Sequence, residues 1–353
     1  MGPKNSKKKR RKKKEQKRQN KIQNQLKNEK SMLDKELRLL ILGTGDSGKS
    51  TFVKQMQILF KNGFSKVEIQ LYRDTIRRNL VSHTLKLIKA VEDFNLNLSR
   101  ENTKLAQDFL LIEDEESKLE LTEKKKNQII QLWSDKAMKH VFERRSEFQI
   151  PDSAASFLDQ VEEISSTDYV PTKDHILGCR IPTTGVKEVT FSTDDFTWRI
   201  IDVGGQRSER RKWIHHFENI SILIYVVALS EYNLKLFEEQ NINRMIESLK
   251  LFKQIVTNEY FVQKDCMLLF NKMDLFEEKL KTIDLEVCFS NYTGSNDVDE
   301  AVEFISEKFL DSVENKYRNI HIFRSTGTDT SRIQKIFEEI KSSVLEGLQN
   351  DLD

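Results

Sequence analysis

Short apolar runs recur along much of the chain, and segments with helical spacing separate most of them. The runs are Leu37–Leu42, Val186–Phe191, Phe196–Val203, Ile220–Leu229, Cys266–Phe270 and Ile320–Phe323. Their length suits buried strands, whereas Asn243–Ile255 and Val298–Val313 repeat apolar residues at the period of a helix. Strands that alternate with helices indicate a doubly wound α/β domain with a mostly parallel sheet.

This alternation stops between about residues 62 and 175. The apolar positions there follow helical spacing from Tyr72 to Ile88, and again within Ile129–Phe142 and Ser153–Ile164. The pattern predicts an all-helical insertion inside the α/β domain. The expected division is a basic tail with an N-terminal helix (1–36), a first part of the α/β domain (37–61), the helical insertion (62–175) and a second part of the α/β domain (176–353).

Charge separates the tail from the rest of the chain. Residues 1–30 contain 14 Lys or Arg against two acidic residues, Glu15 and Glu29, which gives a net charge of +12. Because the whole chain carries a formal net charge of +2, the remaining residues carry −10. The tail has only a thin apolar stripe, so a helix formed there needs a partner to cover that stripe.

Cysteine use and hydropathy argue against several classes of protein. The three cysteines, Cys179, Cys266 and Cys288, are odd in number and form no C-x-x-C pair. This pattern argues against a disulfide framework or a structural zinc site and fits a reducing cytosol. The longest apolar run, Ile220–Leu229, is about half the roughly 20 residues that span a bilayer, so it predicts a buried strand.

A phosphate-binding loop follows the first predicted strand. Gly43–Ser50 has the sequence GTGDSGKS, which matches G-x-x-x-x-G-K-[ST], and it opens a predicted helix from Thr51 to Phe60. Glycines let backbone N–H groups form an anion nest, and the helix N-terminus adds positive potential. Lys49 is expected to reach the β- and γ-phosphates and Ser50 to bind Mg²⁺. This motif alone does not separate kinases, ATPases and GTPases.

A second motif indicates which base is bound. Asn271-Lys272-Met273-Asp274 follows the run Cys266–Phe270, and ligands of open α/β sheets bind where strands end. The Asp274 carboxylate can accept hydrogen bonds from guanine N1 and N2, and adenine has no such donor pair. Lys272 is expected to pack along the base and Asn271 to join loops. The tetrapeptide is common by itself, but in this order after a phosphate-binding loop it indicates guanine.

A third motif supplies groups for hydrolysis. Asp202-Val203-Gly204-Gly205-Gln206 ends another predicted strand. Asp202 can hold a water bound to Mg²⁺, the backbone N–H of Gly205 can meet the γ-phosphate, and Gln206 can orient the attacking water. A strand followed by an ordinary Gly-Gly turn is the alternative reading.

Several segments together resemble one family. Residues 202–218, DVGGQRSERRKWIHHFE, resemble switch II of heterotrimeric G protein α subunits, and residues 168–185 resemble the linker into their switch I. Asp152-Ser153-Ala154-Ala155 matches their helical-domain loop that faces the nucleotide. The resemblance covers about residues 36–340. It implies a Ras-like P-loop GTPase domain, with a doubly wound, mostly parallel six-stranded sheet and an inserted all-helical domain.

The resemblance also implies residue roles. Arg180 corresponds to the built-in arginine finger, which acts with Gln206 in catalysis, and Thr183 joins Ser50 as a Mg²⁺ ligand. The backbone N–H of Gly327 is expected to meet guanine O6. The implied contacts with GTP or GDP are Asp46, Ser47, Gly48, Lys49, Ser50, Thr51, Asp152, Ser153, Leu177, Gly178, Cys179, Arg180, Thr183, Asp202, Gly205, Gln206, Asn271, Lys272, Asp274 and Gly327.

Partners follow from the same resemblance. A GDP-bound α subunit binds a Gβγ dimer and the GTP-bound form signals to an effector, with a receptor or other exchange factor and an RGS-type GTPase activator acting on the cycle. The C-terminus, Val344–Asp353, departs from the family because it is acidic and lacks the usual apolar pair and cysteine. Conventional receptor coupling therefore stays an open question.

The N-terminus predicts membrane contact. Met1–Ser6 fits the myristoylation pattern M-G-x-x-x-[ST] with Gly2 as acceptor, although Pro3 is an unfavourable neighbour. Lys7–Lys14 is a run of eight basic residues that anionic lipids attract. The favoured location is the cytoplasmic face of the plasma membrane, with a cytosolic pool. Nuclear targeting or RNA contact by the same run is the less favoured alternative.

Two other functions compete with a signalling GTPase. One is a nucleotide-locked interaction scaffold, against which Arg180 and Gln206 argue. The other is a different P-loop enzyme such as a nucleotide kinase, which leaves Asn271–Asp274 unexplained.

Overall fold

The structure is a computed structural model that describes residues 36–350 except 112–118, 146, 149, 194–195, 237, 240, 263 and 314–318; for 345–350 it describes the backbone only. The predicted tail helix, the basic run Lys7–Lys14 and the acceptor Gly2 lie outside the described residues. Among the described helices, none combines the length and apolar character that crossing a bilayer requires.

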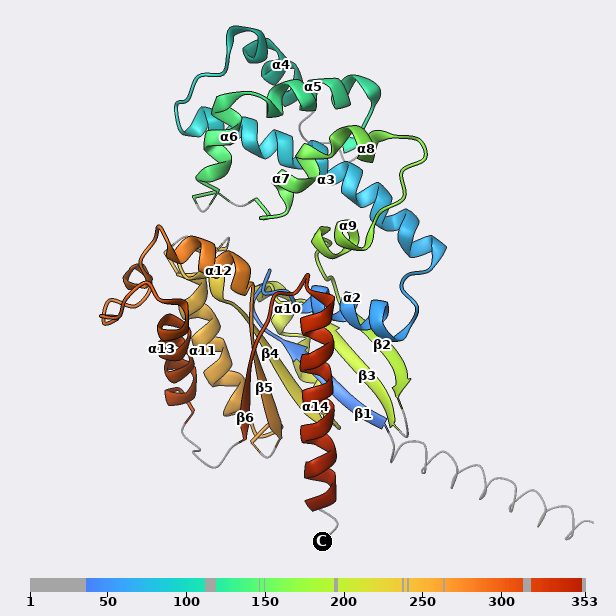
Figure 1. The fold of residues 1–353 in the computed structure, drawn as a ribbon, viewed down its shortest axis with the longest axis vertical. Helices are drawn as coiled ribbons and strands as arrows, with labels where there is room; N and C mark the ends of the chain where they lie inside the picture. The colour runs from blue at the N-terminus through green and yellow to red at the C-terminus, as the bar shows by residue number, and fades with distance from the viewer. Residues whose placement is uncertain are drawn as a thin grey trace, which may run out of the picture.

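A six-stranded sheet forms the centre of the α/β part (Figure 1). Its strands are β1 (Glu36–Leu42), β2 (Val186–Thr193), β3 (Phe196–Val203), β4 (Ile222–Ala228), β5 (Asp265–Asn271) and β6 (Ile320–Arg324). They lie in the order β2-β3-β1-β4-β5-β6, and only the edge pair β2–β3 is antiparallel. The predicted mostly parallel six-stranded sheet is confirmed. One predicted strand, Ile220–Leu229, is shorter than expected at both ends: β4 begins at Ile222, and Leu229 already starts a 3₁₀ turn.

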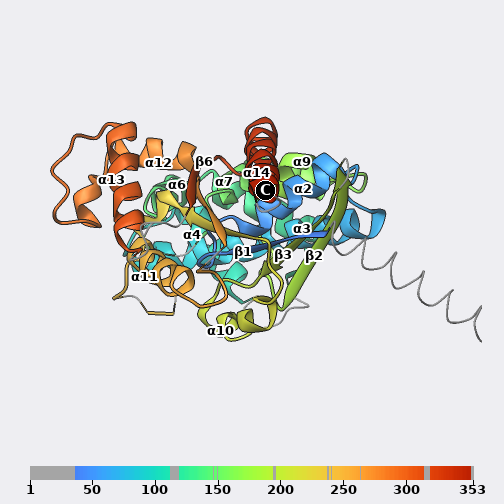
Figure 2. The same ribbon diagram turned by 90° about the horizontal axis from the view of Figure 1, so that it is seen from below.

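Helices cover both faces of this sheet (Figures 1 and 2). On one face lie α2 (Lys49–Phe60) and α14 (Thr330–Asn350), where the ring of Phe337 packs 5.0 Å from that of Trp198 on β3. The helices on the other face are α11 (Arg244–Val256), α12 (Met273–Leu280) and α13 (Val298–Asp311). A parallel sheet must bury both faces, which explains why β4 is apolar and buried along its whole length.

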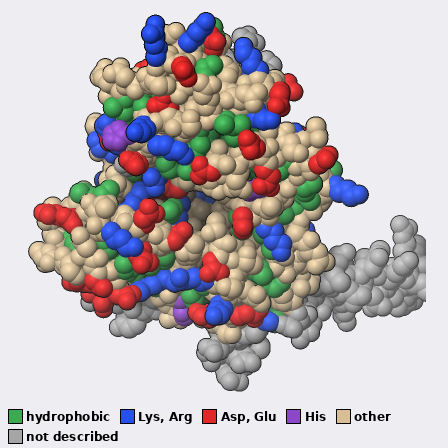
Figure 3. All heavy atoms as spheres, turned by 45° about the horizontal axis from the view of Figure 1, so that its top comes forward, with side chains coloured by type: hydrophobic (Ala, Val, Ile, Leu, Met, Phe, Trp, Pro, Cys, Tyr) green, Lys and Arg blue, Asp and Glu red, His purple; other side chains and the backbone are tan. Residues whose placement is uncertain are grey.

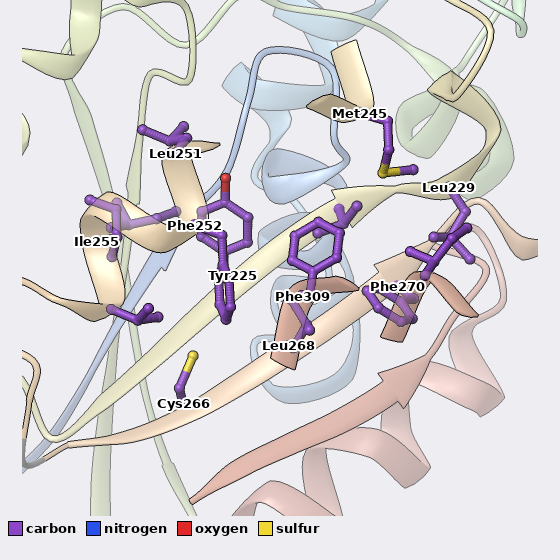
Figure 4. Close-up of a cluster of buried hydrophobic side chains, with 14 of the residues drawn as sticks. Tyr225, Leu229, Met245, Leu251, Phe252, Ile255, Cys266, Leu268, Phe270 and Phe309 are labelled. Atoms are coloured by element: carbon purple, nitrogen blue, oxygen red, sulfur yellow. The ribbon is translucent and has the colours of Figure 1, made fainter. Parts of the chain in front are cut away.

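Alternate residues of the central strands enter two separate cores. Ile224 and Val226 of β4 face α2 and α14, whereas Tyr225 faces α11. In the second core, aromatic rings form a continuous series from Tyr225 through Phe252 to Phe309, with centroids 5.1 and 5.3 Å apart (Figure 4). This packing fixes the carboxyl ends of β4 and β5, from which site residues extend.

Only helices lie between α2 and β2 in the part of the chain that is described. They are α3 (Lys66–Asp93), α4 (Arg100–Leu110), α5 (Glu123–Trp133), α6 (Lys136–Glu143), α7 (Ala154–Asp159), α8 (Val161–Ser165) and α9 (Lys173–Gly178). They share a core of their own, and in Figure 1 the helices α3–α8 lie above the sheet with α9 between the two parts. The predicted helical segment Ile129–Phe142 is in fact two helices, because the Asp135 side chain caps α6 by accepting from Ala137 N.

The remaining short elements lie in the second part of the chain. They are α10 (Arg207–Arg210) and the 3₁₀ turns η2 (Trp213–His216), η3 (Leu229–Glu231) and η4 (Leu285–Val287). The domain boundaries proposed from the sequence stay a prediction.

Candidate nucleotide-binding site

The loop Gly43–Ser50 joins β1 to α2 with its backbone turned as an anion nest requires. Gly48, the residue before α2, has φ +102°, and Asp46 also has positive φ at +65°. A side chain at Gly48 would collide with the amide of Asn271, so only glycine fits there. The first N–H groups of α2, a helix of 12 residues, have no partner within the helix and provide positive potential beside the loop.

Lys49 is buried under this loop. Its Nζ donates to the carbonyl oxygens of Gly43 at 3.1 Å and Thr44 at 2.6 Å. Burial lowers the pKa of Lys49, while the nearby Asp202, Asp46 and Glu231 act in the opposite direction. Gly205 lies against Lys49 Nζ and the Thr44 carbonyl, and any side chain at that position would overlap them. The glycine therefore allows the segment after β3 to approach the phosphate-binding loop.

Three oxygen-bearing side chains from separate segments meet beside this lysine. The Ser50 hydroxyl lies 2.8 Å from Thr183 Oγ1 and donates to Asp202 Oδ2 at 2.7 Å. Asp202 is fully buried, and its second oxygen, Oδ1, has no hydrogen-bond partner among the described residues. Burial raises the pKa of Asp202, and Lys49 opposes that shift. Two hydroxyls and an unsatisfied carboxylate oxygen fit Mg²⁺, which prefers hard oxygen ligands and keeps several waters.

The two predicted catalytic residues lie against neighbouring residues of the same loop. Arg180 Nε pairs with Asp46 Oδ1 at 2.8 Å, and Arg244 Nη1 lies 3.6 Å from the other oxygen of that carboxylate. Gln206 precedes α10 and faces Gly45 of the loop. The guanidinium and the amide therefore border the same end of the loop.

Asn271 links the loops at the other end. Its Nδ2 donates to Ser47 O at 2.9 Å, and its Oδ1 accepts from Ser325 Oγ at 3.1 Å. The Gly327 carbonyl accepts from Gln55 Nε2 at 2.9 Å, which attaches the β6–α14 loop to α2. These bonds hold Lys272, Asp274 and Gly327 around one space.

The helical part closes the site. Asp152 lies between Arg145, with Nε at 3.2 Å, and Lys272, with Nζ at 3.8 Å. Burial acts to raise the pKa of Asp152, but Lys272, Lys279 and Arg145 outweigh it and lower that pKa. Ser153 Oγ donates to Gly178 O at 2.8 Å, which joins the loop before α7 to the end of α9.

A cavity of about 440 Å³ runs through this junction, and Figure 3 shows the molecule hollowed between its upper and lower parts. Every predicted site residue except Ser47 and Asp202 lines it. Ser47 and Asp202 are buried behind residues that line the cavity. Ser47 accepts a hydrogen bond from Asn271, and Asp202 accepts one from Ser50. The volume and the mixture of backbone, charged and hydroxyl groups suit a small charged ligand.

Comparisons with known proteins agree with this geometry. The family model described as "G-protein alpha subunit" matches residues 16–344. The chain is 38% identical to guanine nucleotide-binding protein G(o) subunit alpha of Locusta migratoria over 88% of each chain. It is 40% identical, again over 88% of each chain, to the alpha-17 subunits of Caenorhabditis elegans and Caenorhabditis briggsae.

The chain belongs to the G-protein alpha subunit family. Members of this family bind guanine nucleotides, and the resemblance found in the sequence is confirmed. In this α subunit, residues 202–218, which resemble switch II in sequence, run from the end of β3 through α10 and η2. Glu247 on α11 pairs there with Arg207 at 3.0 Å and Arg210 at 2.6 Å, and Trp213 is buried with Nε1 donating to Gly204 O at 2.8 Å.

Sequence reasoning missed several charged residues of the α-subunit site. Glu231 pairs with Lys272 at 3.1 Å and with Arg244 at 3.3 Å, and Arg145 pairs with Asp152. Burial acts against the charge of Lys272, but Glu231 and Asp152 raise the pKa of this lysine. These residues match no motif, so only the fold reveals that they meet.

Lys54 is the missed residue with the clearest positioning role. It extends from α2, and its buried Nζ donates to Ile176 O at 2.9 Å and to Cys179 O at 2.7 Å. Burial lowers the pKa of Lys54 to about 8. Lys54 thereby attaches the end of α9, and with it the backbone beside Arg180, to the helix that follows the phosphate-binding loop.

Replacing Lys54 with methionine is expected to lower the free energy of unfolding by about 2 kcal/mol, because two buried carbonyl groups lose a charged donor. Hydrogen exchange at the end of α9 and chemical denaturation measure the effect. Lys61→Met, at the exposed end of the same helix, is the matched control. Equal stability of the two variants would contradict the role of Lys54.

Proposed function

We propose that this α subunit is a Mg²⁺-dependent switch that binds GTP and GDP and slowly hydrolyses GTP. The observation that carries the proposal is the meeting of Ser50, Thr183 and Asp202 beside Lys49, in a site bordered by Arg180 and Gln206. Each of these groups has a defined use in phosphoryl transfer. Asp274 lines the same cavity at the end suited to a base.

Binding would use the two ends of the cavity differently. The N–H groups of the phosphate-binding loop and Lys49 Nζ would hold the β- and γ-phosphates. The Asp274 carboxylate would accept from guanine N1 and N2, and the backbone N–H of Gly327 would meet O6. Residues 62–175 would act as an inserted helical domain, with Asp152 and Ser153 covering the nucleotide.

The hydroxyls of Ser50 and Thr183 would hold Mg²⁺, with Asp202 bonded to one of its waters. When bound, the ion neutralises charge on the β- and γ-phosphate oxygens. The unsatisfied Asp202 Oδ1 is the group in this structure that supports such a partner.

Hydrolysis would use Gln206 and Arg180 together. Gln206 orients a water, whose oxygen bonds to the γ-phosphorus while the bond from that phosphorus to the β–γ bridging oxygen breaks. The bridging oxygen leaves with GDP, and the proton of the water passes to the phosphate or solvent. Arg180 would leave Asp46 and bind the transferring group. Turnover of about 10⁻² s⁻¹ is general for α subunits with this arginine and does not come from the geometry here.

Hydrolysis would then change the partners. Thr183 and Gly205 lose their γ-phosphate contacts, so both switch segments relax. The GDP form would bind Gβγ near Arg210 and Lys212, and the GTP form would bind an effector. A receptor or other exchange factor and an RGS-type activator would control the two steps.

The tail would hold the protein at the cytoplasmic face of the plasma membrane, with a cytosolic pool. Myristoylation at Gly2 and the basic run Lys7–Lys14 supply the two signals that stable anchoring needs. RNA contact by the same run is the less favoured use. Mass spectrometry of the N-terminal peptide and sedimentation with anionic vesicles test both signals.

Nucleotide binding and hydrolysis on purified protein test the central proposal. GTP is expected to bind far more tightly than ATP, and radiolabelled GTP is expected to yield one GDP and one phosphate only when Mg²⁺ is present. Equal affinity for ATP, or transfer of the γ-phosphate to a second substrate, would favour another P-loop enzyme. Binding without hydrolysis would favour a scaffold.

Replacing Gln206 with leucine is expected to slow single-turnover hydrolysis by about 10²-fold, since the attacking water loses its orienting group. GTP affinity is expected to stay within a few-fold, because binding rests on other residues. Quenched single-turnover assays measure the rate. Gln254→Leu, at an exposed position of α11, is the control. An unchanged rate in the Gln206 variant would remove this residue from the mechanism.

A further inference from the structure

Glu231 is a buried carboxylate outside the phosphate-binding, base-reading and hydrolytic groups. It ends η3, directly after β4, a strand that is buried along its whole length. The residue is only 3% exposed and lines the cavity of the candidate site. Because a charged side chain is rarely buried to this extent unless it is paired, the partners of Glu231 indicate what it does.

One oxygen of Glu231 pairs with two cations from different segments. Its Oε1 lies 3.1 Å from Lys272 Nζ, at the base end of the cavity, and 3.3 Å from Arg244 Nη1 on α11. Both cations are mostly buried, so little water screens the repulsion between them. The carboxylate therefore allows two like charges to lie close together.

Each of these cations has a further carboxylate partner along the cavity. Lys272 Nζ lies 3.8 Å from Asp152 Oδ2 of the helical part, and Arg244 Nη1 lies 3.6 Å from Asp46 Oδ2 of the phosphate-binding loop. With the outer partners of those carboxylates, side chains of alternating charge form a continuous series. They are Arg145, Asp152, Lys272, Glu231, Arg244, Asp46 and Arg180. Glu231 is the middle member, so it joins the base half of the series to the phosphate half.

Stability of the fold does not account for such a series. Removing charges from water offsets most of their mutual attraction, so apolar residues of similar volume often stabilise a buried position as well or better. Fixed charges instead hold side chains in defined directions. Here the side chains held on either side of Glu231 belong to the two segments that meet a nucleotide.

We propose that Glu231 is a positioning residue that couples the base end of the site to its phosphate end and thereby slows the dissociation of bound GDP. This inference deepens the proposed function and rests on its nucleotide-binding part. Without the carboxylate, Lys272 and Arg244 repel each other and move apart. Lys272 then leaves the base, and Arg244 shifts toward Asp46, which already pairs with Arg180. The nucleotide loses support at both ends.

The first experiment measures the dissociation of a fluorescent GDP analogue from the full chain with Mg²⁺, after addition of excess GDP. Glu231→Gln keeps the size of the side chain and removes its charge, and it is expected to speed dissociation roughly tenfold or more through loss of two charge-assisted contacts. Glu231→Asp keeps a charge between the two cations and is expected to restore slow dissociation. Glu259→Gln, at an exposed position outside the cavity, is the matched control.

Two results of this experiment would overturn the proposal. One is dissociation from Glu231→Gln at the rate of the Glu259→Gln control. The other is equally fast dissociation from Glu231→Gln and Glu231→Asp, which would assign the effect to packing and not to charge.

A double-mutant cycle tests the coupling itself, which a structural role alone would not produce. Lys272→Met and Arg244→Met each remove one cation from the shared oxygen of Glu231. Their effects on GDP dissociation are expected to depart from additivity by about threefold or more, as is usual within one ion-pair network. In a Glu231→Gln background the effects are expected to add, since nothing then holds the two cations together.

Additive effects in the presence of Glu231 would overturn the coupling, and this half of the cycle stays decisive even if Glu231→Gln fails to fold. Loading of the analogue separates the two levels of inference. If the unaltered chain does not load, the proposed nucleotide binding fails together with the coupling. If the chain loads and dissociation does not depend on Glu231, only the coupling fails.

Discussion

Replacing Arg180 with methionine is expected to slow GTP cleavage by about 10³-fold, the lower end of the effect known for arginine fingers in GTPases of this class. The main chain of Arg180 is fixed on both sides, since Asn79 Nδ2 donates to Arg180 O at 3.3 Å and Lys54 holds Cys179 O. The guanidinium is therefore delivered to the phosphate-binding loop by a constrained segment.

Nucleotide affinity is expected to change little in the same variant. The pair between Arg180 and Asp46 is partly exposed, with side chains 35% and 25% accessible, and such pairs contribute at most about 1 kcal/mol. Arg244 also remains near the Asp46 carboxylate. The variant should thus separate catalysis from binding.

Acid-quenched single-turnover assays on preloaded protein measure the cleavage rate, and a fluorescent GDP analogue measures affinity. Arg78→Met, on an exposed part of α3, is the matched control. Cleavage within threefold of the unaltered protein would mean that Arg180 only pairs with Asp46.

The sequence was most informative where backbone geometry dictates residue type. The motif predicted the place of Gly48 in the phosphate-binding loop. The structure shows why glycine is needed there, because the residue has positive φ and lies in close contact with Asn271. Both ends of the strand Phe196–Val203 were predicted correctly, because the apolar run in the sequence has the same bounds as β3. Local rules of this kind need no knowledge of distant segments.

Contacts between distant segments could not be predicted in the same way. Lys54 and Cys179 are 125 residues apart, and their contact depends on how α9 packs against α2. The helix break at Asp135 was missed because apolar spacing continues across a capped turn and conceals the boundary. Glu231 and Arg244 also match no motif, although they organise the charges around Asp46 and Lys272.

The base end of the cavity is as constrained as the phosphate end. Met273 N donates to Ser325 O at 3.2 Å, and Asn271 bonds to both Ser47 and Ser325, so the start of α12 cannot shift independently of the phosphate-binding loop. Asp274 lies in the first turn of that helix and lines the cavity. A substitution at Asp274 therefore tests base recognition in a fixed frame.

Asp274→Asn is expected to weaken GTP binding by roughly 10²–10⁴-fold, since two hydrogen bonds to a charged acceptor contribute about 1.5–3 kcal/mol each. The amide would direct N–H donors at the guanine N–H groups, whereas ATP affinity should stay as it was because adenine makes no such pair. Xanthosine triphosphate, with a carbonyl oxygen at C2, is expected to bind the variant better than the unaltered protein. Competition against a fluorescent GDP analogue measures all three, with Glu277→Gln on the exposed side of α12 as control. If the ratio of GTP to ATP affinity is the same in both variants, Asp274 does not select the base, and the guanine contacts must be reassigned to the Gly327 loop.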